Sequence, residues 1–144
     1  MSDKDNSYQA RNSGQNVAEQ RFENYCKFKG YVCQRFGFDE KSGNLQNFYD
    51  ISPVIRSLPD YMIIKDGRSI FVHVKGTNKI KLMDLVNYSI FEQMLSNGIP
   101  VYYAFMFEDS MHMLTMDQLL SKCTGKKIEE FPNDKHQFIS LDFK

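Results

Sequence analysis

Two apolar runs flank the dipeptide formed by Asp66 and Gly67, and this is the strongest local pattern in the chain. Asp-Gly favours a two-residue type I′ turn, because both central positions of that turn need a positive φ. A turn of this length also fixes the register of the two strands that it joins. The pairs expected to face each other are Lys65 with Arg68, Ile63 with Ile70, and Asp60 with His73.

Side chains alternate between the two faces of a strand, so the second strand of this hairpin has two distinct faces. Phe71, His73 and Lys75 share one face, and we expect the other face to be the buried one. That other face carries Ile70, Val72 and Val74. Asp60 lies opposite His73, within about 5 Å, and Lys75 lies on the diagonal, within about 8 Å. An acid, an imidazole and an ammonium are therefore expected to meet at one spot.

The remaining pattern predicts helices and strands around this hairpin. Apolar residues at helical spacing predict helices over residues 15–29 and 82–96, and Thr115 is expected to cap a third helix that runs to Lys122. Strands are expected over residues 31–38, 100–107, 111–114 and 137–143, the last as an edge strand. Residues 79–81 are expected to form a basic linker. The buried side of the second helix is expected to carry Leu85, Ile90, Phe91, Met94 and Leu95.

The order of these elements indicates an α/β fold. The run over residues 100–107 is continuously apolar, which is typical of a strand covered on both faces. A helix between the hairpin and this run suits a parallel βαβ unit with a right-handed crossover. We therefore expect a mixed sheet with helices on its faces, in a single domain over residues 15–144. Residues 1–14 are polar and are expected to form a mobile tail.

Composition limits the function classes only loosely. The chain has 144 residues, enough for one domain with a core, and its formal net charge is zero, so any nucleic-acid surface must be local. Its three cysteines show no metal-ligand spacing and suggest reduced thiols in a cytoplasmic setting. No signal peptide and no membrane-length apolar run is apparent.

Four segments taken together resemble the PD-(D/E)xK nuclease superfamily, which includes Holliday-junction resolvases, many restriction enzymes and small phage nucleases. The segments are AEQRFENYCKFKGY (18–31), LPDYMI (58–63), FVHVKGT (71–77) and IPVYYAF (99–105). Each motif is weak alone, and the resemblance depends on their joint order and spacing. It implies a restriction-endonuclease-like fold and cleavage of DNA by metal-activated water, leaving 5′-phosphate and 3′-hydroxyl ends.

The resemblance also implies roles for individual residues. Asp60 matches the metal-binding aspartate, Glu19 the glutamate of the first helix, and Lys75 the lysine of the last motif. The backbone carbonyl of Val74 would be a further metal ligand, and His73 stands where the family usually has an acid. Each residue also has an ordinary interpretation: Glu19 would complete a capping box, Asp60 would simply open a strand, and Lys75 would be a solvated lysine at a sheet edge.

The expected cofactor is a divalent cation, Mg²⁺ or Mn²⁺. Such an ion polarises the phosphate and lowers the pKa of a bound water, and it takes one or two carboxylates from the protein. Three interpretations of His73 stay open, because imidazole suits Mn²⁺, Fe, Ni or Zn better than Mg²⁺. His73 is a ligand of a softer metal, or it orients Asp60 through a hydrogen bond, or the site is degenerate and the domain only binds.

The resemblance extends to partners. Lys79 and Lys81 could contact the DNA backbone, and Gln93, on the helix that often borders the site in this family, could contact phosphate; all three are explained equally well or better as solvated surface residues. A homodimer is expected, since small nucleases need two sites to cut two strands. The expected setting is a bacterial or phage-infected cell. The alternative function is a catalytically inactive nuclease-fold protein that binds DNA or a protein, as an inhibitor or a defence-evasion factor.

Overall fold

A computed structural model describes residues 3–37, 52–95, 98–133 and 136–143 of the chain, with residues 3–15 described by their backbone alone. The helices are α1 (Asp3–Lys29), α3 (Pro53–Arg56), α4 (Leu82–Met94) and α5 (Met116–Cys123). The strands are β1 (Val32–Arg35), β2 (Tyr61–Lys65), β3 (Arg68–Lys75), β4 (Lys79–Lys81), β5 (Val101–Met106), β6 (Met111–Leu114), β7 (Ile128–Glu130) and β8 (Gln137–Ser140). Together they form one α/β domain.

The strands form two sheets. The larger sheet has the order β1-β2-β3-β5-β6, in which β3 and β5 run parallel and the other pairs are antiparallel. This confirms the predicted mixed sheet, and α4 makes the predicted crossover between β3 and β5. The smaller sheet has the order β4-β8-β7 and was not predicted. The segment predicted as a basic linker is strand β4, and β8 lies in the middle of its sheet instead of at an edge, because β7 pairs with its other side.

The predicted hairpin register is confirmed. Lys65 pairs with Arg68 and Ile63 pairs with Ile70. At the turn, Asp66 has φ 52° and Gly67 has φ 76°, the two positive values that a type I′ turn requires. Tyr61 pairs with Val72 at the other end of the ladder, and this register continues to Asp60 and His73.

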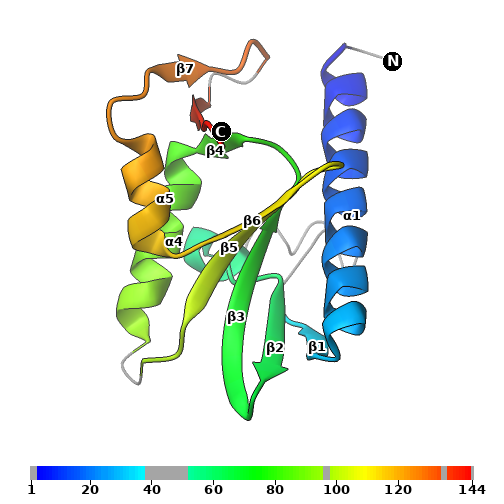
Figure 1. The fold of residues 1–144 in the computed structure, drawn as a ribbon. Helices are drawn as coiled ribbons and strands as arrows, with labels where there is room; N and C mark the ends of the chain where they lie inside the picture. The colour runs from blue at the N-terminus through cyan, green and yellow to red at the C-terminus, as the bar shows by residue number, and fades with distance from the viewer. Residues whose placement is uncertain (1–2, 38–51, 96–97, 134–135, 144) are drawn as a thin grey trace.

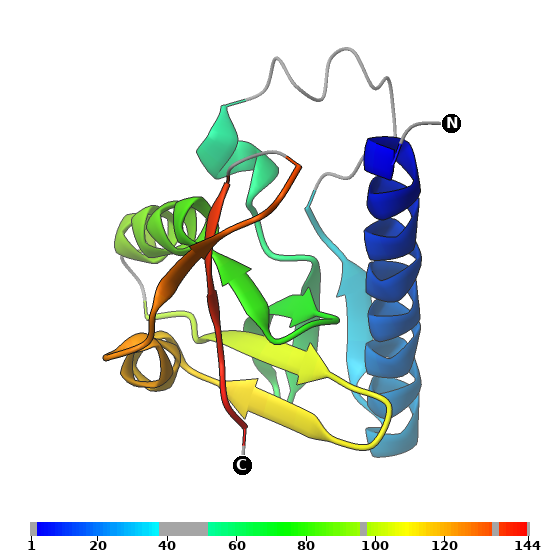
Figure 2. The same ribbon diagram turned by 90° about the horizontal axis from the view of Figure 1, so that it is seen from above.

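Helices cover both faces of the larger sheet. Figure 1 shows α1 along one side of the sheet and α4 with α5 along the other, and Figure 2 shows the same three layers from above. On the α1 side, Phe22 and Cys26 pack with Val72, Val74 and Ala104. On the α4 and α5 side, the core combines residues from the sheet with those helices: Phe71, Tyr103, Phe105, Tyr88, Phe91 and Leu119.

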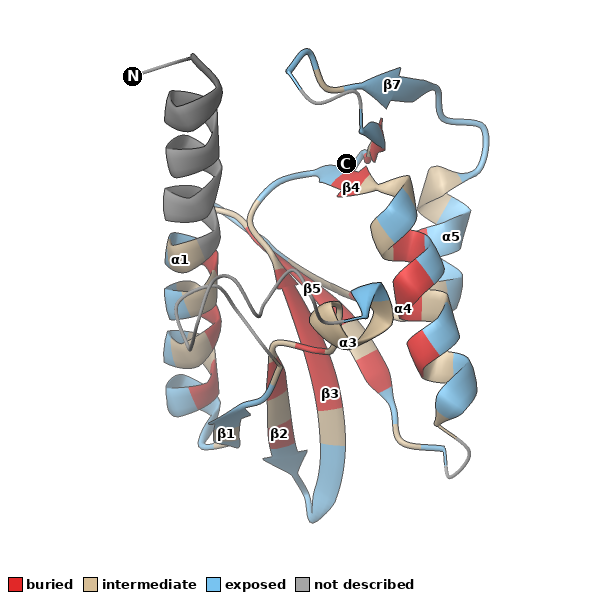
Figure 3. Cartoon of the chain, turned by 180° about the vertical axis from the view of Figure 1, so that it is seen from behind, coloured by how far each residue is buried: buried red, intermediate tan, exposed pale blue. Residues whose placement is uncertain are grey.

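Burial corrects one expectation about β3. We expected only the face with Val72 and Val74 to be buried, but the face with Phe71 and His73 is buried as well. In Figure 3 the buried residues run along β5 and along the half of β3 that lies away from the hairpin turn, while the hairpin end of β3 is exposed. The reason is the position of β3 between β2 and β5, in a sheet that helices cover on both sides. His73 therefore lies in the core beneath α4.

Two further differences concern the helices. α1 begins at Asp3, upstream of the predicted start at Gln15, because residues 3–14 contain no proline to break a helix. Asn16, the residue that would cap the helix in a capping box with Glu19, therefore lies inside the helix. On α4, Ile90 and Met94 are exposed although both were predicted to be buried. Within the described residues, no helix has the length and the apolar character needed to cross a membrane.

Candidate functional site

Asp60 ties the start of β2 to the end of β3. Its Oδ2 accepts a hydrogen bond from the backbone N–H of Val74 at 2.7 Å, and its own carbonyl accepts the N–H of Phe36 at 2.8 Å. Burial raises the pKa of the Asp60 carboxyl to about 6, although the Val74 N–H and the nearby Lys75 ammonium both act to lower this pKa. Asp60 is therefore a partly desolvated carboxylate beside a cation, a setting common at functional sites.

Lys75 lies at the same end of the sheet, between the sheet and α4. Its Nζ lies 3.6 Å from Oδ2 of Asp84 and 5.0 Å from the ring centroid of Tyr88. Burial alone would lower the pKa of the Lys75 ammonium, but the Tyr88 hydroxyl and the carboxylates of Asp84 and Asp60 outweigh it, so the pKa lies above its ordinary value. Lys75 is therefore a cation held in place, and a fixed cation can balance negative charge on a bound anion.

Glu19 approaches this site from α1. Its Oε2 accepts a hydrogen bond from Nη2 of Arg35 at 3.1 Å, and the Glu19 side chain is only 12% exposed. Glu19 and Asp60 are close enough for the charge of Glu19 to raise the pKa of Asp60. The capping interpretation of Glu19 is therefore wrong, because the helix starts far upstream and the side chain pairs with β1 instead.

His73 has a different environment from the other three residues. Its side chain is 2% exposed, and its ring lies 4.1 Å from that of Tyr88 and is stacked 4.9 Å from that of Tyr103, as measured between centroids. Among the described residues, its Nε2 has no hydrogen-bond partner. Burial, with the nearby charge of Lys75, lowers the pKa of His73 well below its ordinary value, so the ring is neutral. Because Nε2 is buried, a metal ion would reach it only after a movement of the residues that cover it.

Of the other predicted residues, some lie near Asp60 and Lys75 and one lies far from them. Val74 directs its side chain into the core on the α1 side, while its backbone N–H bonds Asp60. Lys79 and Lys81 lie on β4, directly after the end of β3, and contact the ring of Phe131 at 5.7 Å and 6.0 Å. Gln93 lies near the far end of α4, about 13 Å along the helix axis from Asp84. The structure therefore does not bring Gln93 to Lys75.

Sequence reasoning placed Tyr88 only on the helix expected to border the site and gave it no role, and it did not consider Asp84. Both belong to α4, four positions apart, and a four-residue spacing places two side chains on one helix face. That spacing, together with a predicted helix returning over the strand that ends in Lys75, was a usable signal. Arg35 on β1 was missed as well, and no pattern in the sequence connects it to Glu19.

The carboxylates of this site are oxygen donors, the type of ligand that magnesium and manganese ions prefer. Within the described ranges, no three His, Cys, Asp or Glu side chains lie close enough together to enclose a metal. Mg²⁺, however, needs only one or two protein carboxylates and keeps several waters. Asp60 and Asp84 both interact with Lys75, and the carboxylates of Glu19, Asp60 and Asp84 outnumber the cations Lys75 and Arg35. An oxygen-rich, net negative site suits Mg²⁺ or Mn²⁺ better than Zn²⁺.

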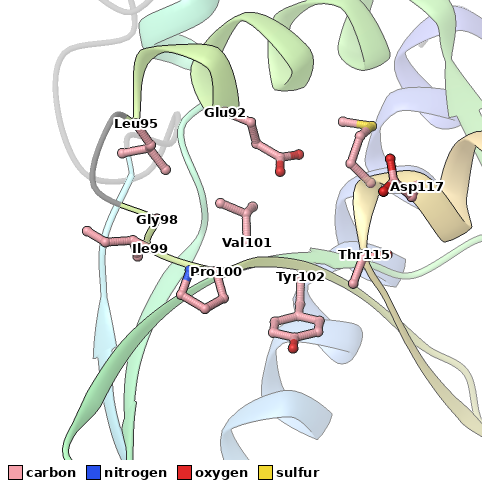
Figure 4. Close-up of a pocket in the computed structure, with 10 residues that line it drawn as sticks. Glu92, Leu95, Gly98, Ile99, Pro100, Val101, Tyr102, Thr115 and Asp117 are labelled. Atoms are coloured by element: carbon pink, nitrogen blue, oxygen red, sulfur yellow. The ribbon is translucent and has the colours of Figure 1, made fainter.

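A surface pocket of about 350 Å³ lies elsewhere, between the end of α4, the start of β5 and the start of α5. Figure 4 shows Glu92 and Asp117 among its lining residues, together with apolar side chains such as Leu95 and Ile99. Glu92 accepts a hydrogen bond from the Tyr103 hydroxyl at 2.6 Å. None of the residues of the candidate site lines this pocket. The site at Asp60 is therefore separate from this pocket.

Comparison with protein-family models gives no match for the chain, and comparison with curated proteins gives none either.

Proposed function

We propose that this protein is a metal-dependent endonuclease that hydrolyses phosphodiester bonds in DNA. The observation that carries the proposal is the hydrogen bond between the Asp60 carboxylate and the Val74 N–H, which holds an acid beside Lys75. Glu19 lies within electrostatic range of the same carboxylate. An acid at the entry of one strand and a lysine at the end of its neighbour are the two groups that the family resemblance assigns to the reaction.

The order of elements supports the proposal. A helix with Glu19 comes first, Asp60 opens β2, Lys75 ends β3, and α4 leads to the apolar strand β5. This is the order in which the resembled family carries its motifs. The position of β3 beside β5 in a parallel pair supports the same proposal.

Each residue has a defined part in the proposed reaction. A bound Mg²⁺ or Mn²⁺ would polarise the scissile phosphate and supply a water of lowered pKa. Asp60 would hold this ion, with Glu19 or Asp84 binding directly or through its waters. The Lys75 ammonium would orient the attacking water or offset the charge that develops on phosphate. Tyr88 and Asp84 keep that ammonium at the end of β3.

A second function, binding without cleavage, is favoured by one observation. The position that usually carries an acid holds His73, and this imidazole is buried between two tyrosines. A protein that had lost the acid could keep the fold and bind DNA or a protein partner. The zero formal net charge of the chain is in line with this alternative.

The two functions differ in a cleavage assay. Supercoiled plasmid and a branched DNA substrate are incubated with Mg²⁺ and, separately, with Mn²⁺, using the wild type and the Asp60→Ala variant. Asp66→Asn is the control, because Asp66 lies at the hairpin turn and asparagine also tolerates positive φ. We expect cleavage by the wild type and the control, and at least a 100-fold loss in Asp60→Ala. Cleavage that survives Asp60→Ala rejects the enzyme function as it is built here on Asp60, and cleavage that never occurs with either metal rejects the enzyme function itself.

A further inference from the structure

The C-terminal half of α1 packs against one face of β1. Side chains alternate along a strand, so Tyr31, Cys33 and Arg35 share that face. The Tyr31 ring lies 6.2 Å from the ring of Tyr25 between centroids, and Nη2 of Arg35 donates to Oε2 of Glu19 at 3.1 Å. Cys33 therefore lies between two contacts that both reach α1.

Cys26 is the residue of α1 that meets Cys33. Glu19 and Cys26 are about two helical turns apart, which places them on the same face of α1. Cys26 is fully buried, and Cys33 is partly buried against the same core cluster. Both are free thiols, and they form a side-chain hydrogen bond with each other. A disulfide needs the two sulfurs to close to about 2 Å, a movement that rotation of the cysteine side chains supplies.

The turn between α1 and β1 holds this pair in place. Gly30 has φ 75°, the left-handed conformation that ends many helices, and the N–H of Tyr31 bonds the carbonyl of Cys26 at 2.9 Å. Cys33 pairs with Ile63 of β2 in the larger sheet. The backbone thus fixes both cysteines, one at the end of the helix and one in the ladder.

We propose that Cys26 and Cys33 form a reversible intramolecular disulfide that links α1 to β1, with a low-molecular-weight disulfide such as oxidised glutathione as the oxidant. The Cys33 thiolate attacks one sulfur of the oxidant and releases the first small thiolate. Cys26 then loses its proton, attacks the Cys33 sulfur of this mixed disulfide and releases the second. The protein thiols give up two electrons and two protons, and the oxidant takes them up as two small thiols.

Exposure decides which thiol reacts first. Cys33 is partly exposed, whereas Cys26 is covered, so the oxidant reaches Cys33. Burial raises the pKa of Cys26 to about 12 and also raises the pKa of Cys33, although the hydrogen bond with Cys26 acts to lower that of Cys33. Because the thiolate is the nucleophile, we expect oxidation over hours at about pH 8.

The fold selects this pair among the three cysteines. Cys123 lies on α5, and Figure 1 shows α1 and α5 on opposite sides of the larger sheet. The disulfide lies in the same contact between α1 and β1 as the pair of Glu19 with Arg35, so it would hold that part of α1 on the sheet. The inference does not rest on the proposed nuclease function, because it uses only the packing of α1 on β1.

Peptide mapping by mass spectrometry tests the inference, after the folded protein is incubated with an excess of oxidised glutathione. The wild type and the matched control Cys123→Ser should both contain the link between Cys26 and Cys33. Cys26→Ser should stop at the mixed disulfide of Cys33 with glutathione, and Cys33→Ser should leave Cys26 a free thiol. A wild type with glutathione on Cys33 and a free thiol on Cys26, with links to Cys123 instead, or with no modification at all overturns the inference.

Thermal unfolding tests whether the native packing accommodates the bond. Closing the loop of residues 26–33 restricts the unfolded chain, so the Tm of the oxidised wild type and of oxidised Cys123→Ser should rise by about 5–10 °C. Dithiothreitol should reverse the rise, and the Tm of Cys33→Ser should not respond to the oxidant. A linked protein with a Tm at or below that of the reduced protein would mean that the bond distorts the contact between α1 and β1, which overturns the inference.

Discussion

Oδ2 of Asp60 accepts the backbone N–H of Val74 at 2.7 Å, so the entry of β2 is bonded to the end of β3 at the residue before Lys75. This hydrogen bond fixes the position of one oxygen of the Asp60 carboxylate. The Lys75 ammonium lies within electrostatic range of the same carboxylate. The two strands are also joined by the tight turn at Asp66 and Gly67 at their other end. The hairpin is therefore fixed at both of its ends, and Asp60 and Lys75 lie together at the end opposite the turn.

Asp60 should make stability depend on pH in a direction opposite to most acids. Its pKa is raised by burial to about 6 in the folded chain, against about 3.9 when unfolded, so the folded state holds the proton more tightly. This stability is present below about pH 4 and is lost as the pH rises through about 6. As the pH rises from 4 to 7, in EDTA, the free energy of unfolding of the wild type should fall by about 2 kcal/mol relative to that of Asp60→Asn. Urea unfolding of both proteins at each pH measures this difference. A difference between the two proteins that does not change with pH contradicts the prediction.

His73 should behave as a neutral core residue. Its pKa is lowered by burial, so protonation is favoured in the unfolded chain, and stability is lost as the pH falls below about 6.5. His73→Phe keeps the ring contacts with Tyr88 and Tyr103 and removes the unpartnered Nε2. As the pH falls from 7.5 to 5, we expect the free energy of unfolding of this variant to rise by about 2 kcal/mol relative to that of the wild type. Thermal unfolding at the two pH values measures the gain, and equal pH dependence would mean that His73 is solvated.

The metal preference of His73→Glu separates the interpretations of this residue. If the imidazole is a ligand, a glutamate in its place should shift cleavage from Mn²⁺ towards Mg²⁺. The buried environment instead leads us to expect an unchanged metal preference, together with a loss of about 2–5 kcal/mol of stability, because the carboxylate would be buried without a partner. Cleavage rates in each metal, with urea unfolding of the same samples, distinguish these results.

The sequence predicted the hairpin and the β3–β5 crossover because short-range rules control both. The two-residue turn fixed the pairing of Lys65 with Arg68, and the apolar run over residues 100–107 identified a central strand. The prediction that His73 lies on an unburied face was wrong. The alternation of side chains along a strand assigns residues to two faces, but it does not show which faces other elements cover. The apolar run held the missing information: β5 was predicted to be covered on both faces, and its parallel neighbour β3 shares that cover.

The rest of the site depends on contacts between distant segments. Glu19 and Arg35 meet because α1 packs beside β1, and Lys75 meets Asp84 because α4 returns over the end of β3. Neither contact follows from local spacing alone. Likewise, Ile90 and Met94 fit a helical apolar pattern, but the pattern could not show which side of α4 faces the sheet.

Asp84 should act by positioning Lys75. Asp84→Asn removes the ion pair, and we expect about a 10-fold loss in the cleavage rate with a stability change below about 1 kcal/mol, as for other partly exposed pairs. Asp84→Glu should recover part of the rate. Asp117→Asn is the matched control, since Asp117 also lies in the first turn of a helix but lines the separate pocket. Equal rate losses in Asp84→Asn and Asp117→Asn would reject the positioning role.

Gly67→Ala should destabilise the hairpin through its backbone alone. Gly67 has φ 76°, and a Cβ built there meets no atom within 4 Å, so no steric contact adds to the conformational cost. We expect a loss of about 1–2 kcal/mol in the free energy of unfolding, with the urea m-value unchanged. A loss near zero would mean that the turn adopts another conformation in solution.

A double-mutant cycle on cleavage tests most directly whether Asp60 and Lys75 form one site. Initial rates of plasmid cleavage are measured for the wild type, Asp60→Asn, Lys75→Met and the double variant, in saturating Mn²⁺. Groups that act as a unit give strongly non-additive effects. We predict that each single variant loses at least 100-fold and that the double variant is no slower than the worse single one. Rate losses that multiply in the double variant, or a wild type that does not cleave, would contradict the account.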